Sequence, residues 1–123
     1  MGRPTDYSPE LAGRICNLLA EGKSLREICD ADDMPSRETV RRWRNSNEEF
    51  RGQYALAREE QADTGFDELV ELSDSATPDT VNVVRLQIET RKWAYAKLKP
   101  GTYGERLDHK IAVEPINVNI NLG

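Results

Sequence analysis

The sequence predicts a mainly α-helical protein with an N-terminal helix-turn-helix domain, a central antiparallel helical hairpin and a short C-terminal β segment. Three observations lead to this fold class. Serine-capped amphipathic stretches crowd into the first 46 residues, residues 48–99 hold long helical stretches broken once at Pro78, and the chain ends in a strict alternation of apolar and polar residues. We therefore divide the chain into residues 1–46, 47–100 and 101–123.

The first predicted helix begins at Pro9, with Ser8 as its cap, and ends at Gly22. Its apolar residues recur at helical spacing: Leu11, Ile15, Leu18 and Leu19. With the apolar residues of the next two helices they form one small core, and both cysteines fit the same inward faces. Buried thiols of this kind are typical of a reducing compartment and predict no disulfide framework.

Residues 23–45 predict two short helices joined by a tight turn. Ser24 and Glu27 form a capping box, so a helix should start at Ser24 and end near Ala31, before the turn-forming residues 32–35. Ser36 then caps a second helix that runs to about residue 45. This arrangement is that of a helix-turn-helix DNA reader.

The second of these helices has an apolar side and a basic side. Val40 and Trp43 lie on the side that docks on the protein, and residues 36–46 hold four arginines against one glutamate. Because the whole chain has a net charge of −5, this local excess of positive charge favours a DNA contact over a merely solvated face. The candidate DNA-binding residues are Arg37, Glu38, Arg41, Arg42, Arg44 and Asn45, with Lys23 and Arg3.

Arg3 is included because residues 2–4 could form an arm in the minor groove, although a disordered chain end is the alternative. The negative charge lies in the middle of the chain, where residues 59–98 carry nine acids and four bases. No apolar run has the length of a membrane span, and no secretory signal follows Met1. We expect a cytoplasmic protein without membrane contact.

The central residues predict the hairpin. One helix should run from Glu48 to about Ser75, and a second from Asp79 or Thr80 to Lys99. The second helix has apolar residues on two faces, and its hairpin partner can cover only one of them. We expect the other face, with Val83, Leu86 and Trp93, to pack against another subunit. The alternative is that the long helix and the N-terminal domain cover one face each.

The C-terminal tail predicts a β-strand, in which Ile116, Val118 and Ile120 share one face. A single strand in a helical chain needs partners, so equivalent strands of neighbouring subunits could close into a barrel. Such a barrel packs its interior well at about eight strands, which favours a ring of roughly eight to ten subunits. A disordered tail is the alternative.

The sequence contains no motif that indicates an enzyme. His109 is the single histidine, and neither a phosphate-binding loop nor a dinucleotide fingerprint is present. Asp63, Asp67 and Glu71 share one predicted helix face, which in principle could hold a divalent ion but is more typical of a solvated acidic face. We expect no catalytic residue, no metal and no cofactor.

Four segments together closely resemble the small terminase subunits of tailed bacteriophages over essentially the whole chain. They are residues 2–7, the helix-turn-helix with residues 39–43, residues 90–94, and Pro100 leading to Tyr103 and Gly104. The resemblance implies a non-enzymatic ring that selects double-stranded viral DNA for packaging and recruits a large subunit with ATPase and nuclease activities. A helix-turn-helix transcriptional regulator and a protein-binding adaptor remain the rival functions.

Overall fold

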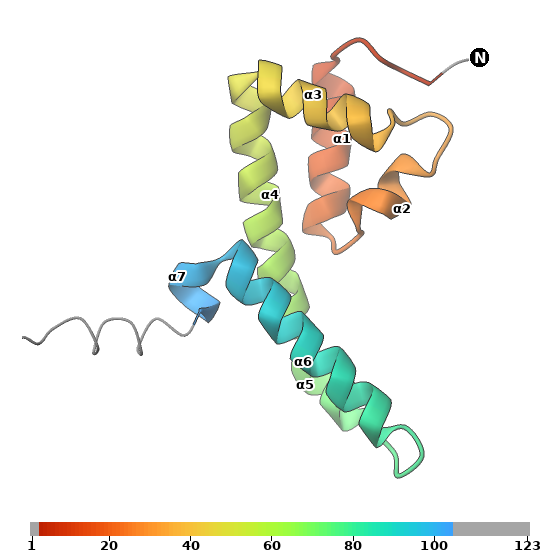
Figure 1. Cartoon of the computed structure of the whole chain (residues 1–123), viewed down its shortest axis with the longest axis vertical. Helices are drawn as coiled ribbons and strands as arrows, with labels where there is room; N and C mark the ends of the chain where they lie inside the picture. The colour runs from red at the N-terminus through yellow and green to blue at the C-terminus, as the bar shows by residue number, and fades with distance from the viewer. Residues whose placement is uncertain (1–2, 105–123) are drawn as a thin grey trace, which may run out of the picture. The chain divides into compact units, whose positions relative to one another are not determined.

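The computed structural model describes residues 3–104, and this part of the chain is helical (Figure 1). The helices are α1 (Pro9–Ala20), α2 (Leu25–Cys29), α3 (Arg37–Ser46), α4 (Glu48–Asp67), α5 (Leu69–Asp74), α6 (Val81–Leu98) and α7 (Pro100–Tyr103). The prediction of a mainly α-helical fold is confirmed. The predicted β segment lies outside the described residues. Within residues 3–104, no helix is both long and apolar enough to cross a bilayer.

The described residues divide after residue 70 into two compact units, residues 3–70 and residues 71–104. The N-terminal unit therefore contains α4 in addition to the three helices expected there. The predicted assignment of residues 1–46 to DNA binding and of 47–100 to oligomerisation is a functional division, and it stays a prediction.

Four helix starts follow the caps expected from the sequence. The side-chain oxygens of Ser8, Ser24, Ser36 and Asn47 each accept a hydrogen bond from a backbone N–H three residues later. At Ser24 the box is complete, because its own N–H donates to the Glu27 carboxylate at 2.9 Å. Gly22, at φ 112°, follows α1 in a conformation that other residues rarely adopt.

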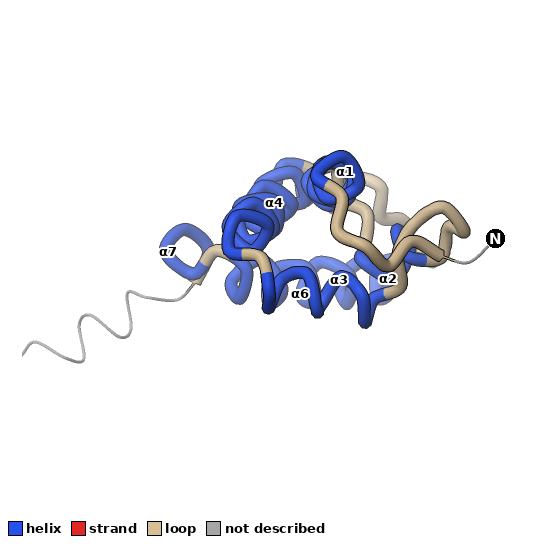
Figure 2. Tube along the Cα trace, turned by 90° about the horizontal axis from the view of Figure 1, so that it is seen from above, coloured by secondary structure: helices blue, strands red, loops and turns tan. Residues whose placement is uncertain are grey.

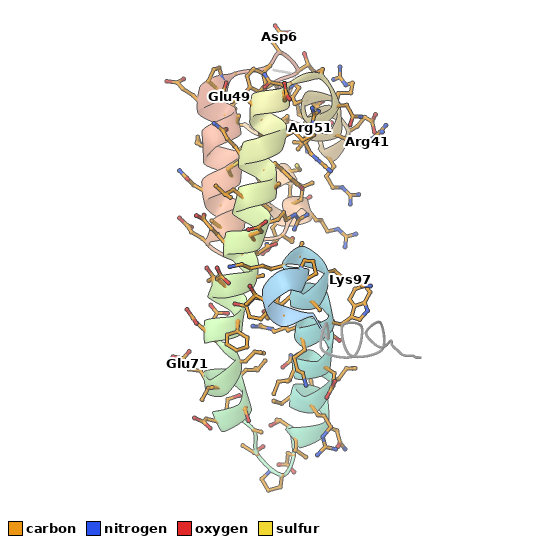
Figure 3. The ribbon with its side chains drawn as sticks, turned by 90° about the vertical axis from the view of Figure 1, so that its left-hand side faces the viewer. Asp6, Arg41, Glu49, Arg51, Glu71 and Lys97 are labelled. Atoms are coloured by element: carbon orange, nitrogen blue, oxygen red, sulfur yellow. The ribbon has the colours of Figure 1, made fainter. Side chains whose placement is uncertain are left out.

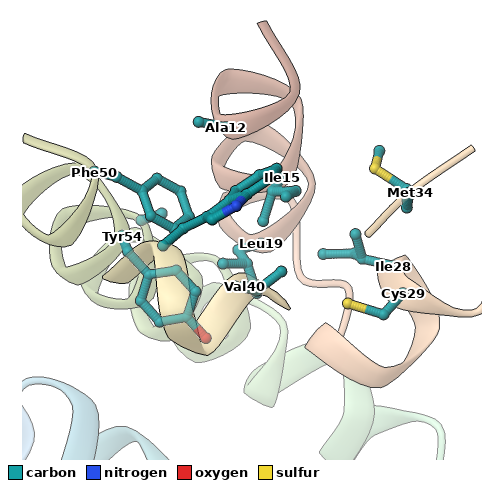
Figure 4. Packing of buried hydrophobic residues seen from close by; sticks show 11 residues of the cluster. Ala12, Ile15, Leu19, Ile28, Cys29, Met34, Val40, Phe50 and Tyr54 are labelled. Carbon is teal, nitrogen blue, oxygen red and sulfur yellow. The ribbon is translucent and has the colours of Figure 1, made fainter. Parts of the chain in front are cut away.

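The core of the N-terminal unit lies between α1, α3 and α4, with α1 and α4 side by side (Figures 1 and 2). The predicted inward residues Ile15, Leu19 and Val40 are fully buried. The structure adds residues of α4 that the sequence reading left outside the core, above all Phe50, which is also fully buried (Figure 4). Edge-on ring contacts link Tyr7, Trp43, Phe50 and Tyr54 with centroid distances of 5.3–6.1 Å.

The first helix of the pair ends at Cys29, near the expected Ala31, whose N–H bonds to the carbonyl of Ile28, three residues back. One predicted boundary was wrong. The long helix is interrupted at Glu68, whose N–H bonds to the carbonyl of Gly65, three residues back rather than four. Helix α6 ends at Leu98, close to the expected Lys99, and Pro100 opens the separate short helix α7, where a proline needs no N–H partner.

In the C-terminal unit, α6 and α7 pack together through Tyr95 and Tyr103, whose ring centroids lie 6.3 Å apart. The turn before α6 is closed by reciprocal bonds: the N–H of Thr77 donates to the hydroxyl of Thr80, and the N–H of Thr80 donates to that of Thr77. The two apolar faces of α6 differ in exposure. One contains the buried Val84 and Tyr95, and the other is largely exposed.

Candidate nucleic-acid interface

Helix α3 is held to the N-terminal unit by its apolar side. Val40 is fully buried and Trp43 is 4% exposed, as expected from the sequence. The indole N–H of Trp43 donates to the carbonyl of Thr5 at 3.2 Å, which fixes the ring as well as burying it. Ser36 caps the helix and also donates its hydroxyl to Thr39 at 3.1 Å. These contacts set both the rotation and the start of α3.

The opposite side of α3 is exposed and carries the candidate residues Arg37, Glu38, Arg41, Arg42 and Asn45. Arg41 and Glu38 form an ion pair of 2.7 Å, one helical turn apart and more than 60% exposed on both sides. The hydrogen bond from Arg41 lowers the pKa of the Glu38 carboxyl, and the same bond raises the pKa of Arg41. An exposed pair of this kind stabilises the fold little, so Arg41 remains available for another anion.

Arg42 and Arg44 point to different neighbours. A guanidinium N–H of Arg42 donates to the hydroxyl of Thr39 at 3.2 Å. The guanidinium carbon of Arg44 lies 4.5 Å from the ring centroid of Tyr54 on α4, which is cation–π geometry. Arg44 therefore marks the place where the basic surface of α3 meets α4.

Two arginines of α4 extend this basic surface, and the sequence reading missed both. Arg51 donates to the backbone carbonyl of Arg44 at 2.7 Å, and Arg58 lies 5.4 Å from the Tyr54 ring and donates to its hydroxyl at 3.2 Å. Figure 3 shows Arg51 on α4 and Arg41 on α3. The helical spacing of Phe50, Tyr54 and Ala57 would have revealed that the start of α4 packs on the core.

Lys23 and Arg3 occupy other places. Lys23 is exposed in the α1–α2 connection, and its carbonyl accepts a hydrogen bond from Gln61 at 2.9 Å. Arg3 donates to the backbone carbonyls of Cys29 and Met34 at 2.6 and 3.2 Å. As placed, the Arg3 guanidinium therefore binds the protein itself. The assignment of all eight candidate residues to DNA stays a prediction.

Charge also indicates where DNA would not bind. A surface pocket of about 580 Å³ between α1 and α4 is lined by Glu21, Glu60, Asp63 and Asp67, and the phosphate backbone would be repelled there. Among residues 3–104, no cluster of histidine, cysteine or acidic side chains has the arrangement of a metal site. His109 lies outside the described residues.

The predicted oligomerisation residues of α6 are exposed in the single chain. Val83, Leu86 and Trp93 are 58%, 67% and 65% exposed. The ammonium of Lys97 lies over the Trp93 ring, 5.4 Å from its centroid, and the Trp93 side chain is still largely exposed. The tail residues predicted to share this role, Ile116, Val118 and Ile120, lie outside the described part of the chain.

Comparisons with known proteins show which proteins share this architecture. The family described as "Bacteriophage Sf6, terminase small subunit-like" matches residues 7–110. Three solved structures of terminase small subunit gp1 of the bacterial virus Sf6, each with one substitution, are similar to this chain. Two share 46% identity and TM-scores of 0.76 and 0.77, over 83% of this chain and 85% of theirs. The third shares 39% identity and a TM-score of 0.77, over 98% and 95%.

A curated relative is the uncharacterized protein YffO of Escherichia coli strain K12, which is 40% identical over 50 residues. That match covers 41% of this chain and 36% of YffO, so it carries little beyond a shared segment. The match to the Sf6-like family covers most of the chain and agrees with the solved structures in fold. On this evidence the chain belongs to the terminase small subunit family typified by bacteriophage Sf6.

Proposed function

We propose that this phage packaging subunit recognises double-stranded viral DNA where packaging begins, with the exposed side of α3 in the major groove. It acts as a homo-oligomeric ring in the host cytoplasm, and it recruits and regulates the large terminase subunit, which supplies the ATPase and the nuclease. The small subunit itself performs no chemistry, needs no cofactor or metal and contacts no membrane. The observation that carries the proposal is that α3 has a buried apolar side and, opposite to it, an exposed basic side.

A recognition helix must be held firmly on one side and present donors on the other. Val40 and Trp43 supply the anchor, and Arg37, Arg41 and Arg42 supply exposed guanidinium groups that match phosphate oxygens and the acceptors of guanine. Lys23, Arg44 and Asn45 widen this surface, and Arg51 and Arg58 continue it onto α4. A single helix has few base contacts, so one subunit binds weakly and a ring gains affinity by engaging several sites at once.

Ring formation is supported by the uncovered apolar face of α6. Val83, Leu86 and Trp93 form a row of large apolar side chains that a lone chain leaves in water. Packing this face against a neighbouring subunit removes it from solvent, and the tail strands with Ile116, Val118 and Ile120 then close a barrel. The expected size remains roughly eight to ten subunits.

The proposal is tested by replacing Arg41 and Arg42 with alanine and measuring the affinity for duplex DNA at several salt concentrations. Each lost phosphate contact removes counterion release, so the slope of log K against log salt should flatten by about one to two units. A matched control replaces the exposed Arg85 and Lys92 of α6, which removes the same charge elsewhere. Native mass spectra of both proteins check whether they keep the wild-type assembly.

Two results would contradict the proposal. An unchanged salt slope in the Arg41/Arg42 variant means that these side chains do not contact phosphates. A wild-type particle of only two subunits favours the rival function, a dimeric helix-turn-helix transcriptional regulator.

A further inference from the structure

The segment before α1 lies against the helix-turn-helix pair at three successive points. Arg3 donates to carbonyls near the turn, the carbonyl of Thr5 accepts from the Trp43 indole, and the Tyr7 ring packs edge-on against Trp43. These partners are between 26 and 38 residues away along the chain. Residues 3–7 therefore form a strap across the α2–α3 pair, and we use that name for them.

Arg3 bridges the two ends of the turn. Cys29 is the last residue of α2, so its carbonyl belongs to the group that a helix end leaves without an internal partner. Met34 precedes Pro35 and the Ser36 cap, where α3 begins. One guanidinium nitrogen of Arg3 reaches both carbonyls, at 2.6 and 3.2 Å. The end of α2 and the start of α3 are thereby tied to the same donor.

The bridged turn is otherwise polar at its tip and apolar beneath. Asp30 and Asp33 are exposed, whereas Met34 and Pro35 are buried. Asp33 is held by an ion pair of 3.3 Å with Arg14 of α1, in which both side chains are more than half exposed. Arg3 thus holds this turn at a second point, through charged hydrogen bonds to its backbone. The shape of the turn sets the direction of α3.

We propose that Arg3 is a positioning residue for the DNA-binding face of α3, and that it acts through the strap rather than by contacting DNA. The inference rests on the proposed function and deepens it. A minor-groove arm would need the Arg3 guanidinium to leave both carbonyls, whereas the contacts of Thr5 and Tyr7 keep the chain directly after it against Trp43 of α3. With Arg3 bound to the turn, α3 meets the groove at one angle, and loss of the bridge lets α3 tilt about the anchor at Trp43.

The test replaces Arg3 with glutamine in the full-length protein. Phe, which keeps an aromatic ring at the α6 face, replaces Trp93 in every protein compared, so that Trp43 is the sole tryptophan and reports on the strap. Native mass spectra check that this background keeps the wild-type assembly, and all affinities are compared within it. We measure affinity for a mixed-sequence DNA duplex, the salt slope of that affinity, and acrylamide quenching of Trp43 without DNA. Replacement of Arg26, an exposed arginine on α2, by glutamine is the charge-matched control. Arg3→Lys tests rescue by a side chain that keeps the positive charge and N–H donors.

A positioning role predicts that Arg3→Gln weakens DNA binding by about fivefold to tenfold, with an unchanged salt slope and greater quenching of Trp43. Arg3→Lys should recover part of both effects, and Arg26→Gln should change neither. A fall of about one unit in the salt slope with unchanged quenching shows instead that Arg3 contacts phosphate, and overturns the inference. Unchanged affinity and quenching also overturn it.

Failure of the proposed function gives a different pattern. In that case the wild-type protein shows no salt-dependent binding to DNA, whatever residue stands at position 3. The quenching measurement needs no DNA, so it still decides whether Arg3 holds the strap.

Discussion

Trp93→Asp is the sharpest test of the ring, because it changes one exposed side chain of α6 and predicts loss of the whole assembly. Trp93 is 65% exposed in the single chain, and a tryptophan buries about 150–250 Å² when covered, so each interface would bury about 100–160 Å² through this residue. At about 25 cal/mol per Å² its removal costs about 2.5–4 kcal/mol per contact. The new carboxylate adds a desolvation cost of several kcal/mol.

Native mass spectrometry reads the outcome directly, since each subunit adds 14.0 kDa. We expect the wild-type protein at eight to ten subunits and the Trp93→Asp protein as monomers. Leu56→Asp is the matched control: Leu56 is a large apolar residue with a similar exposure of 61%, but it lies on α4 in the N-terminal unit. It should leave the ring intact. If the Trp93→Asp protein forms the wild-type ring, the α6 face is not the interface.

Three further changes have defined outcomes. Deletion of residues 111–122 should leave rings with a lower thermal midpoint, because α6 still holds them; complete dissociation would assign the main contact to the tail. Phe50→Ala should lower the free energy of unfolding by about 3–5 kcal/mol in urea titrations, since the side chain is fully buried, whereas Leu56→Ala should change it little. Glu27→Gln should melt below wild type at neutral pH. The hydrogen bond from the Ser24 N–H lowers the pKa of the Glu27 carboxyl in the folded protein. The stability that the Glu27 carboxylate contributes is therefore present above the ordinary pKa of 4.5 and is lost as the pH falls through the lowered pKa. A difference in melting midpoint between the two proteins that persists in acid would refute this reasoning.

Local chemistry explains which features could be predicted from the sequence. Ser8, Ser24, Ser36 and Asn47 start helices by bonding to backbone groups only three residues away, so their spacing is visible in the chain itself. The burial of Val40 and Trp43 follows equally from helical periodicity, and with it the direction of the α3 arginines.

The features that sequence reasoning missed depend on contacts between distant segments. Phe50 belongs to the N-terminal core because Tyr7 and Trp43 surround it, and Arg58 joins the basic surface because Tyr54 holds it. The sequence predicts Arg3 as part of a free arm, because no residue near Arg3 in the chain indicates that its guanidinium donates to the carbonyl of Cys29. The break at Glu68 likewise lies in a stretch without proline, where composition alone favours a continuous helix.

The junction between α3 and α4 has a mechanical consequence. Asn47 is the whole connection: its N–H donates to the carbonyl of Trp43, and its side chain accepts from Phe50 at 2.9 Å. The two helices are therefore joined without a flexible linker, and α4 is also bonded to α1 near its far end through Thr64 and the carbonyl of Ala20, so α1, α3 and α4 rotate together. At 1.5 Å per residue the 20 residues of α4 span about 30 Å, so a rotation of these helices by about 10° about α3 displaces the far end of α4 by about 5 Å. If α3 binds DNA as proposed, tension on that DNA would move the far end of α4 by several times the length of a covalent bond.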